Sequence, residues 1–331
     1  MNKKVFITIG VIAAIAIGVF VYLNKSDKKQ VDFQLETVKV AQFSEALLYM
    51  PLYLADDRGF FREEGIAIEI INTGGDNQTF AAVIGGSATF GVADPTFVAI
   101  AKEQGMTGSV IANIVNGVPF WGITNNHAIP EITDAAQLSG YRVATFPSPS
   151  TAFTLQHDMF EMAGLRPNIA QGAFGTLWAM VEAGHADVAL EFEPSVSIAV
   201  NQGAKVLYSL ADYGDFAFTG VTATNATIER RPELVQCFVN ALQKAAVFAH
   251  TYPDSVAYFA SQRFPDLSEE IVRNATGRMI EANMFPQNVI ISEEAWKKAI
   301  KLRQRVGDIN SVEIARSVLD MSFAEKAVNQ K

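Results

Sequence analysis

The chain has 331 residues, of which 49% are hydrophobic and 18% charged, with a net charge of −9 and a sequence pI of about 5.0. This length and composition exclude a disordered chain and leave room for two domains, while the negative charge argues against nucleic-acid binding, because no basic stripe could neutralise phosphates. The lone cysteine, Cys237, excludes an internal disulfide and a cysteine-based metal finger, and its helical context predicts a core thiol.

The N-terminal segment carries an export or membrane signal. Residues 5–23 are apolar apart from one threonine and two glycines, and lysines lie on both sides. A small-residue cleavage site could lie within residues 14–18, but the apolar run continues beyond it. We therefore favour an uncleaved N-terminal membrane anchor or signal over residues 1–23, followed by a polar tether over residues 24–35. No cysteine follows the run, which excludes a lipoprotein anchor, and the protein is expected outside the cytoplasm, attached to the membrane.

The next part of the chain alternates between strands and helices. Buried strands are expected at residues 38–41, 66–70, 88–93 and 109–115. With helices between them this order predicts an open parallel sheet of an α/β protein.

One stretch of this part, from Thr73 to Thr96, combines a glycine turn, a helix, a buried strand and an acid. Asp76 or Asn77 is expected to cap the helix, and Asp94 the helix that follows. The same plan returns between residues 176 and 194, where Gly184 aligns with Gly86 of the first copy. Two such units predict two similar α/β lobes, with helix N-termini and strand ends meeting at a cleft.

The lobe boundaries follow from two apolar segments that are expected to cross between the lobes, residues 120–124 and 216–223. They predict a first lobe over residues 36–121 and 222–331 and a second lobe over residues 122–221. The second lobe should begin with a strand at residues 141–145 and continue with a helix capped by Ser148. Further strands are expected before the acids at 191 and 193 and at residues 204–207.

Beyond residue 225 the apolar spacing is wholly helical. We expect these helices to complete the first lobe, at residues 232–250, 254–263, 268–282, 293–305 and 311–321.

Two blocks of sequence resemble a known family. P-L-Y-L-A-D-D-R-G-F-F-R-E-E-G-I-A-I-E-I at residues 51–70 and G-G-S-A-T-F-G-V-A-D at residues 85–94 are similar to the nitrate/sulfonate/taurine- and thiamine-pyrimidine-binding group of ABC-importer solute-binding proteins. The resemblance covers about residues 36–310. It implies a type II periplasmic-binding-protein fold with two lobes, a small-molecule ligand between them, hinge closure, and an ABC importer permease as partner.

Catalytic motifs are absent from the sequence. The four histidines are far apart, without metal-ligand spacing, and neither a nucleophile elbow nor a phosphate or dinucleotide loop occurs. Pyrimidine synthases are similar in fold to the family, but they carry a cysteine-rich motif that this chain lacks. We therefore expect no enzyme and no cofactor. A sensor ectodomain is a weaker alternative, because the sequence holds no signalling module.

The turns at the expected cleft give the candidate ligand-binding residues. They are Phe43, Ser44, Tyr49, Gly75, Asp76, Asn77, Asp94, Thr96, Trp121, Ser148, Ser150, Thr151, Glu191, Glu193 and Phe218, with Phe120 and Thr219 beside them.

Each of these residues also has a plainer interpretation. Asp76, Asp94 and Ser148 could be helix caps alone, the aromatic residues could be core, and Glu191 and Glu193 could be solvated charges on the rim. The expected convergence of the turns favours a ligand site.

The set contains four acids and no lysine or arginine. Acids beside aromatic rings suit a flat, nitrogen-rich, neutral or cationic ligand such as a pyrimidine or vitamin precursor, stacked on Trp121 or Phe43 and bonded to Glu191 or Glu193. The alternative is a sulfonate, taurine or nitrate held by helix N-termini.

Overall fold

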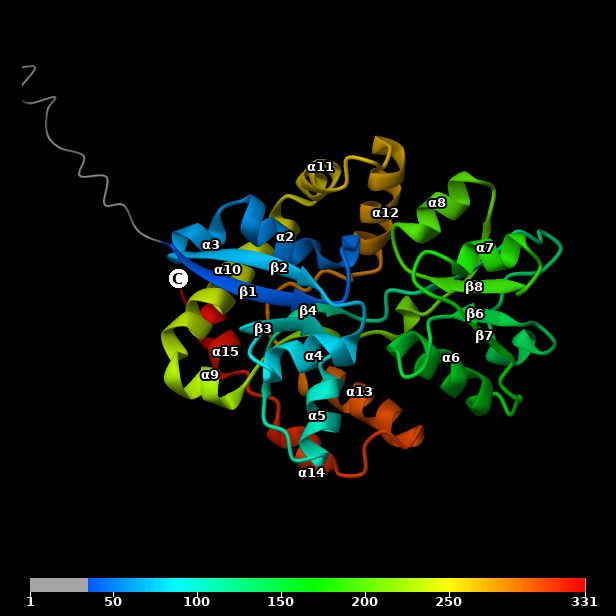
Figure 1. Ribbon diagram of the computed structural model, residues 1–331. Helices are drawn as coiled ribbons and strands as arrows, with labels where there is room; N and C mark the ends of the chain where they lie inside the picture. Colours follow the sequence, from blue (N-terminus) through cyan, green and yellow to red (C-terminus); the bar gives the residue numbers. More distant parts are fainter. Residues whose placement is uncertain (1–34, 331) are drawn as a thin grey trace, which may run out of the picture. The chain divides into compact units, whose positions relative to one another are not determined.

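The computed structural model describes residues 35–330 (Figure 1). The expected anchor at residues 1–23 and nearly all of the tether lie outside the described residues. Among the helices of the described part, none is both long enough and apolar enough to cross a bilayer.

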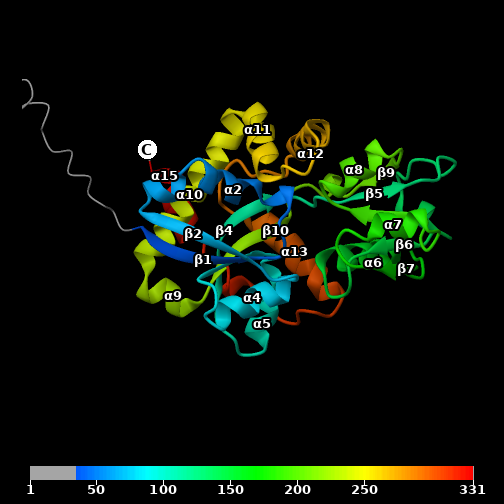
Figure 2. The ribbon, with the colours of Figure 1, turned by 45° about the horizontal axis from the view of Figure 1, so that its top comes forward.

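Two five-stranded sheets form the centres of two lobes, which confirms the expected α/β architecture (Figures 1 and 2). The first sheet has the order β2-β1-β3-β10-β4 and the second the order β7-β6-β8-β5-β9. The strands of the first sheet are β1 (Glu36–Gln42), β2 (Ile66–Asn72), β3 (Phe90–Ala93), β4 (Ser109–Asn116) and β10 (Ala217–Ala223). Those of the second sheet are β5 (Trp121–Thr124), β6 (Val143–Thr145), β7 (Ile169–Gln171), β8 (Val188–Glu191) and β9 (Lys205–Ser209).

Each sheet departs from the expected parallel arrangement at one strand. β10 runs antiparallel to β3 and β4, and β5 runs antiparallel to β8 and β9. Both strands follow a crossing from the other lobe. The chain therefore enters the new sheet at the cleft, where the parallel strands end, and it must run in the opposite direction.

The crossing strands also show where the chain changes lobe. β5 already lies in the second sheet at Trp121, and β10 lies in the first sheet from Ala217 onward. The return to the first sheet therefore comes five residues before the expected position at residue 222.

The internal repeat is present in both lobes. In the first copy α4 (Asp76–Ile84) leads to β3, and in the second α7 (Leu177–Glu182) leads to β8. Gly86 and Gly184 follow these helices with φ of 75° and 74°, a left-handed conformation that glycine adopts without strain. The predicted role of these two glycines as helix stops is confirmed.

Helices cover the sheets, and the C-terminal ones complete the first lobe as expected (Figure 2). α10 packs against α2 and α15, and α13 packs against β10. The other helices are α2 (Met50–Asp57), α3 (Phe60–Glu63), α5 (Thr96–Glu103), α6 (Thr151–Met162), α8 (Ser195–Asn201), α9 (Asn225–Arg230), α10 (Pro232–Thr251), α11 (Pro253–Arg263), α12 (Glu269–Glu281), α13 (Glu293–Arg305), α14 (Val312–Ser317) and α15 (Ser322–Asn329). Three short 3-10 helices are η1 (Leu47–Tyr49), η2 (Ala135–Leu138) and η3 (Ala211–Tyr213).

The last helix expected from the sequence, residues 311–321, is shorter than predicted. α14 ends at Ser317, because the Val318 carbonyl accepts the Val110 amide of β4 and the Asp320 amide donates to the Val110 carbonyl, instead of continuing the helix. Cys237, expected in the core, is half-buried on α10.

Candidate ligand-binding site

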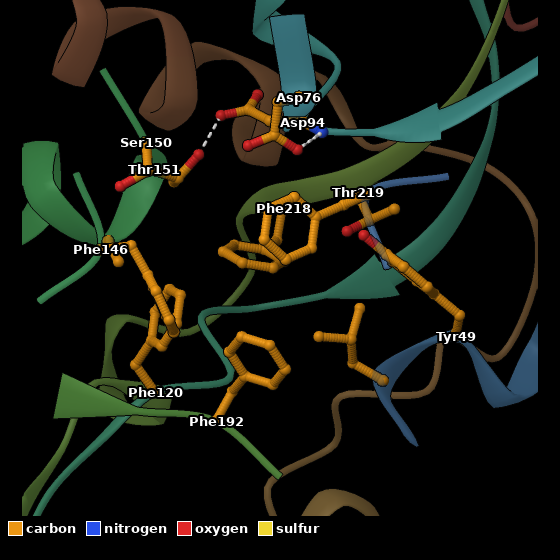
Figure 3. A pocket seen from close by; sticks show the side chains of 13 residues that line it. Tyr49, Asp76, Asp94, Phe120, Phe146, Ser150, Thr151, Phe192, Phe218 and Thr219 are labelled. Carbon is orange, nitrogen blue, oxygen red and sulfur yellow. Dashed lines mark hydrogen bonds between the residues drawn. The ribbon is translucent and has the colours of Figure 1, made fainter. Parts of the chain in front are cut away.

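A cavity of about 50 Å³ lies between the two lobes. Residues from both sheets and from the crossing segments converge on it (Figure 3). Its lining consists of Phe43, Leu48, Tyr49, Asp76, Asp94, Phe120, Phe146, Ser150, Thr151, Ala152, Phe192, Phe218 and Thr219.

The cavity has an aromatic side. Phe120, Phe146 and Phe192 lie together on the side away from the carboxylates (Figure 3). The ring centroid of Phe192 is 5.9 Å from that of Phe120 and 5.5 Å from that of Phe146, and Phe218 meets Phe120 edge-on at 5.4 Å. Such a wall offers ring faces and edges to a flat, apolar or aromatic solute.

The opposite side carries two carboxylates. Asp94 follows β3, and its Oδ1 accepts hydrogen bonds from the amide and the hydroxyl of Thr96 at 2.8 and 2.6 Å. Asp94 thus accepts the first N–H group of α5, but the N-cap position is Pro95 and not Asp94 as expected. The Oδ2 of Asp94 accepts hydrogen bonds from the Thr151 hydroxyl, on the second lobe, and from Arg303 Nη2 at 2.8 Å.

Arg303 is the cation that balances Asp94. It lies on α13 and is only 1% exposed. Burial lowers the pKa of its guanidinium, but Asp94 and Asp308 outweigh that effect, so the pKa is raised and the group stays charged. The residues that line the cavity include no lysine or arginine, as expected, but Arg303 lies directly behind Asp94. Sequence reasoning missed this cation because it comes from a helix 209 residues beyond Asp94.

Asp76 is the second carboxylate and has no such partner. The expected cap of α4 by Asp76 or Asn77 is wrong: the N-cap is Gly75, and the Asp76 carboxylate instead accepts the Asp94 amide at 3.1 Å. Burial, followed by the nearby charge of Asp94, raises the pKa of Asp76 to about 6, and Arg303 offsets this only in part. Asp76 is thus an acceptor at neutral pH with capacity for further hydrogen bonds.

The second lobe contributes the start of α6. Ser150 is the N-cap, accepting the Phe153 amide at 3.3 Å, and Thr151 is the first helical residue. The expected cap, Ser148, lies two residues earlier, where its amide donates to Gln171 Oε1 at 3.0 Å.

Tyr49 lines the first-lobe side of the cavity near Thr219 (Figure 3). Burial, and then the charge of Asp76, raises the pKa of its hydroxyl well above the usual value. The hydroxyl is therefore a neutral donor at physiological pH.

The structure separates the candidate residues into two groups. Those that line the cavity are Phe43, Tyr49, Asp76, Asp94, Ser150, Thr151 and Phe218, together with Phe120 and Thr219. Those that do not line it are Ser44, Gly75, Asn77, Thr96, Trp121, Ser148, Glu191 and Glu193. Residues that sequence reasoning missed are Leu48, Phe146, Ala152 and Phe192. Phe192 could have been found from the alternation of a strand, since it lies between two acids that face the other way.

The two glutamates and Trp121 have other surroundings. Glu193 accepts hydrogen bonds from the Ser197 amide and hydroxyl, both at 3.0 Å, and from Arg278 Nε at 2.7 Å. Glu191 is 1% exposed, and neither of its oxygens is hydrogen-bonded within the described chain. Trp121 is buried, with the Arg278 guanidinium 5.9 Å from its ring. The interpretation of both glutamates as solvated rim charges was wrong, because both are buried.

Comparisons with known proteins agree with this architecture. The family model described as NMT1/THI5 like matches residues 46–256. YtlA of Bacillus subtilis (strain 168), which carries only a provisional description as a binding protein, is 19% identical over 90% of this chain and 91% of its own.

Among solved structures, a protein of Bordetella bronchiseptica RB50 is 18% identical with a TM-score of 0.75, over 88% of this chain and 96% of its own. The alkanesulfonate-binding protein SsuA of Xanthomonas axonopodis pv. citri, bound to MOPS, is 16% identical with a TM-score of 0.69. The match covers 86% of this chain and 98% of the SsuA chain. The desulfurization enzyme DSZB is 13% identical with a TM-score of 0.65, and the match covers 89% of this chain and 99% of the DSZB chain. These structures share the fold, and the fold alone does not separate a binding protein from an enzyme.

Proposed function

Because the chain belongs to the NMT1/THI5-like family, we propose that it is an extracytoplasmic solute-binding protein that delivers a small organic solute to an ABC importer. The solute that suits the site is a flat, nitrogen-containing aromatic such as a pyrimidine or a vitamin precursor. The lysine-flanked apolar run at residues 5–23 would hold the protein at the membrane or direct its export.

One observation carries the choice of solute. The cavity combines a wall of phenyl rings with Asp76, a half-buried carboxylate that has no ion-pair partner within the described chain and retains capacity to accept hydrogen bonds. A heterocycle with ring or amino N–H groups satisfies both features, since its ring stacks on the phenyl groups and its N–H donates to Asp76. In this pose Tyr49 and Thr219 offer hydroxyl groups to a ring nitrogen.

A sulfonate or nitrate is the second candidate, because SsuA shares the fold and the start of α6 lines the cavity, where a helix N-terminus favours an anion. The residues lining the cavity include no lysine, arginine or histidine, and Arg303 is already bonded to Asp94, Thr96, Thr154 and Asp308. An anion would therefore meet two carboxylates without a free cation to offset them.

An enzyme of the pyrimidine-synthase type ranks lower. A cofactor held as a Schiff base would need a lysine at the cavity, and none is among the lining residues. A pyridoxal-phosphate absorbance band in the purified protein would reverse this ranking.

The test begins with a thermal-shift screen against aminopyrimidines, thiamine and flavin precursors, polyamines, taurine, alkanesulfonates and nitrate. Titration calorimetry of Asp76→Asn with the best ligand then measures how much the Asp76 carboxylate contributes to the binding free energy. We expect a loss of about 1.5–3 kcal/mol, or about 10- to 150-fold in affinity, the range for a hydrogen bond to a charged group. Asp266→Asn, the same change on an exposed loop, serves as the matched control.

The pH dependence gives an independent outcome. Because the pKa of Asp76 is about 6, the acceptor is lost as pH falls through 6, and binding of an N–H donor should weaken between pH 7 and 5. An anion would show the opposite trend. Unchanged or tighter binding by Asp76→Asn, together with stronger binding at pH 5, would overturn the heterocycle proposal.

A further inference from the structure

Two arginines from helices of the first lobe are paired with acids of the second lobe. Arg278 of α12 donates through Nε to Glu193 Oε1 at 2.7 Å. Arg305 of α13 donates two hydrogen bonds of 2.6 Å to the two carboxylate oxygens of Asp158 on α6. Helices at these pairs are in contact across the lobes: α12 contacts α8, which begins two residues after Glu193, and α13 contacts α6 (Figures 1 and 2).

Arg303 makes a third bridge between the two lobes. Its Nη1 donates to the Pro149 carbonyl at 3.1 Å and to Thr154 Oγ1 at 3.0 Å, both on the second lobe. Its Nη2 binds Asp94 of the first lobe at 2.8 Å. One guanidinium therefore joins both lobes.

The acids on the second lobe depend on these contacts. The side chain of Glu193 is fully buried and that of Asp158 is 2% exposed. Their partners are more accessible, with 27% of the Arg278 side chain and 34% of the Arg305 side chain exposed. Separating the lobes would remove the cationic partner from each acid.

The two outer pairs lie beside the cavity and not in it. None of Arg278, Glu193, Arg305 and Asp158 is among the lining residues. Protein groups alone satisfy both pairs, so a solute in the cavity neither makes nor replaces them.

The size of the cavity makes these pairs relevant to binding. About 50 Å³ is far below the roughly 300–1,000 Å³ of ordinary small-molecule pockets. Phe43 of the first lobe also meets Phe174 of the second edge-on, with 6.1 Å between ring centroids. A solute larger than this cavity therefore requires the lobes to move apart, and that movement would separate the paired residues.

We propose that Arg278, Arg303 and Arg305, here called the arginine latch, hold the lobes closed independently of any solute and set the rate at which the site opens. The inference rests on the proposed function only in taking this cavity as the place where a solute binds. Arg278 and Arg305 do not touch the solute in this proposal. They are positioning residues, which affect binding by holding the two lobes together.

The latch has a distinctive effect on binding. It stabilises the closed form over the open form by the same amount with and without solute. The latch therefore does not shift the balance between the solute-free closed form and the solute-bound closed form. Where the closed form predominates without solute, weakening the latch should raise the association and dissociation rates by similar factors. The affinity should then change little.

The experiment compares the full chain with Arg278→Gln/Arg305→Gln by small-angle X-ray scattering without any added solute. We expect the radius of gyration to be larger in the double variant. Asp158→Asn/Glu193→Gln removes the same two pairs from the other lobe and should give the same increase, which guards against misfolding of one variant. Lys297→Gln, which removes a cation from an exposed pair on the same helix α13, should leave the radius unchanged.

Stopped-flow binding of the best solute from the thermal-shift screen supplies the kinetic readout. We expect both rates to rise at least threefold in the arginine variant, and Arg278→Lys/Arg305→Lys to restore slower rates. Equal radii for all variants, or a latch variant with a changed affinity at unchanged rates, would overturn the inference. The scattering comparison needs no solute, so failure of the proposed ligand class leaves it intact.

Discussion

Glu191 ends β8 as a buried acid without a hydrogen bond, although the Phe192 amide and the Ser195 hydroxyl lie near enough to favour its charged form in part. Burial raises the pKa of this carboxyl to about 8, compared with 4.5 for an exposed glutamate. Between these pH values the native protein retains a proton that the unfolded chain releases. The free energy of unfolding therefore falls as pH rises from about 4.5 to 8.

Glu191→Gln removes this titration while keeping the shape of the side chain. We expect the free energy of unfolding to rise by about 2–4 kcal/mol at pH 8 and to change little at pH 4.5, since one pKa unit corresponds to about 1.4 kcal/mol. Urea denaturation at pH 4.5, 6.5 and 8 measures the trend. Glu182→Gln, on an exposed position of α7 in the same lobe, should show no such pH dependence. A uniform loss of stability in Glu191→Gln would mean that the carboxyl makes a contact that an amide cannot replace.

At the scale of single residues, the sequence predicted part of the cavity lining but not the partners of those residues. Asp94, Ser150 and Thr151 could be placed at the cleft because they stand where a strand ends or a helix begins, and such positions converge in an α/β sheet. The partner of Asp94 could not be placed in this way. Arg303 lies on a helix whose apolar spacing predicts the helix, but no local pattern shows which of its residues the other lobe covers.

At the scale of elements, the repeat was the most informative pattern. β3 and β8 each begin four residues after the glycine that follows α4 or α7, as the aligned glycines predicted. The antiparallel crossing strands were not predictable, because their direction depends on the lobe from which the chain arrives. β7, at residues 169–171, was missed because its sequence Ile-Ala-Gln is partly exposed and gives no apolar run of the kind that marks β6.

The glycine that ends α7 gives a test of the repeat. Gly184 has φ 74°, and alanine in this left-handed conformation costs roughly 1–2 kcal/mol. We expect Gly184→Ala to lower the free energy of unfolding by about that amount. Gly277, inside α12 with open space where a side chain would start, is the matched control. There alanine should raise stability by roughly 0.5–1 kcal/mol, because glycine is a poor helix former. Similar effects of the two changes would contradict the assigned role of Gly184.

At the scale of the whole molecule, the two lobes are joined by more than the two crossings of the chain. Arg303 contacts Thr96 on the first lobe and Thr151 and Thr154 on the second, all at 3.0 to 3.2 Å. Its guanidinium also lies 4.9 Å from the ring of Phe97. Because a buried polar network is costly to leave half-satisfied, the lobes should unfold together in one cooperative transition.

Arg303→Met tests how far this network holds the molecule together. The change keeps an apolar stem in the buried position but leaves the Asp94 carboxylate, 4% exposed, without its ion-pair partner. We expect the free energy of unfolding to fall by about 3–5 kcal/mol, the usual cost of breaking a buried pair from one side. The double variant Arg303→Met/Asp94→Asn should recover part of this loss, because it removes the uncompensated charge as well. Lys297→Met breaks only the exposed pair with Glu293 on the same helix and should cost less than about 1 kcal/mol. Calorimetry of the same set reports whether the lobes then unfold separately. A loss in Arg303→Met no larger than in Lys297→Met would show that the network between the lobes contributes nothing beyond a surface ion pair.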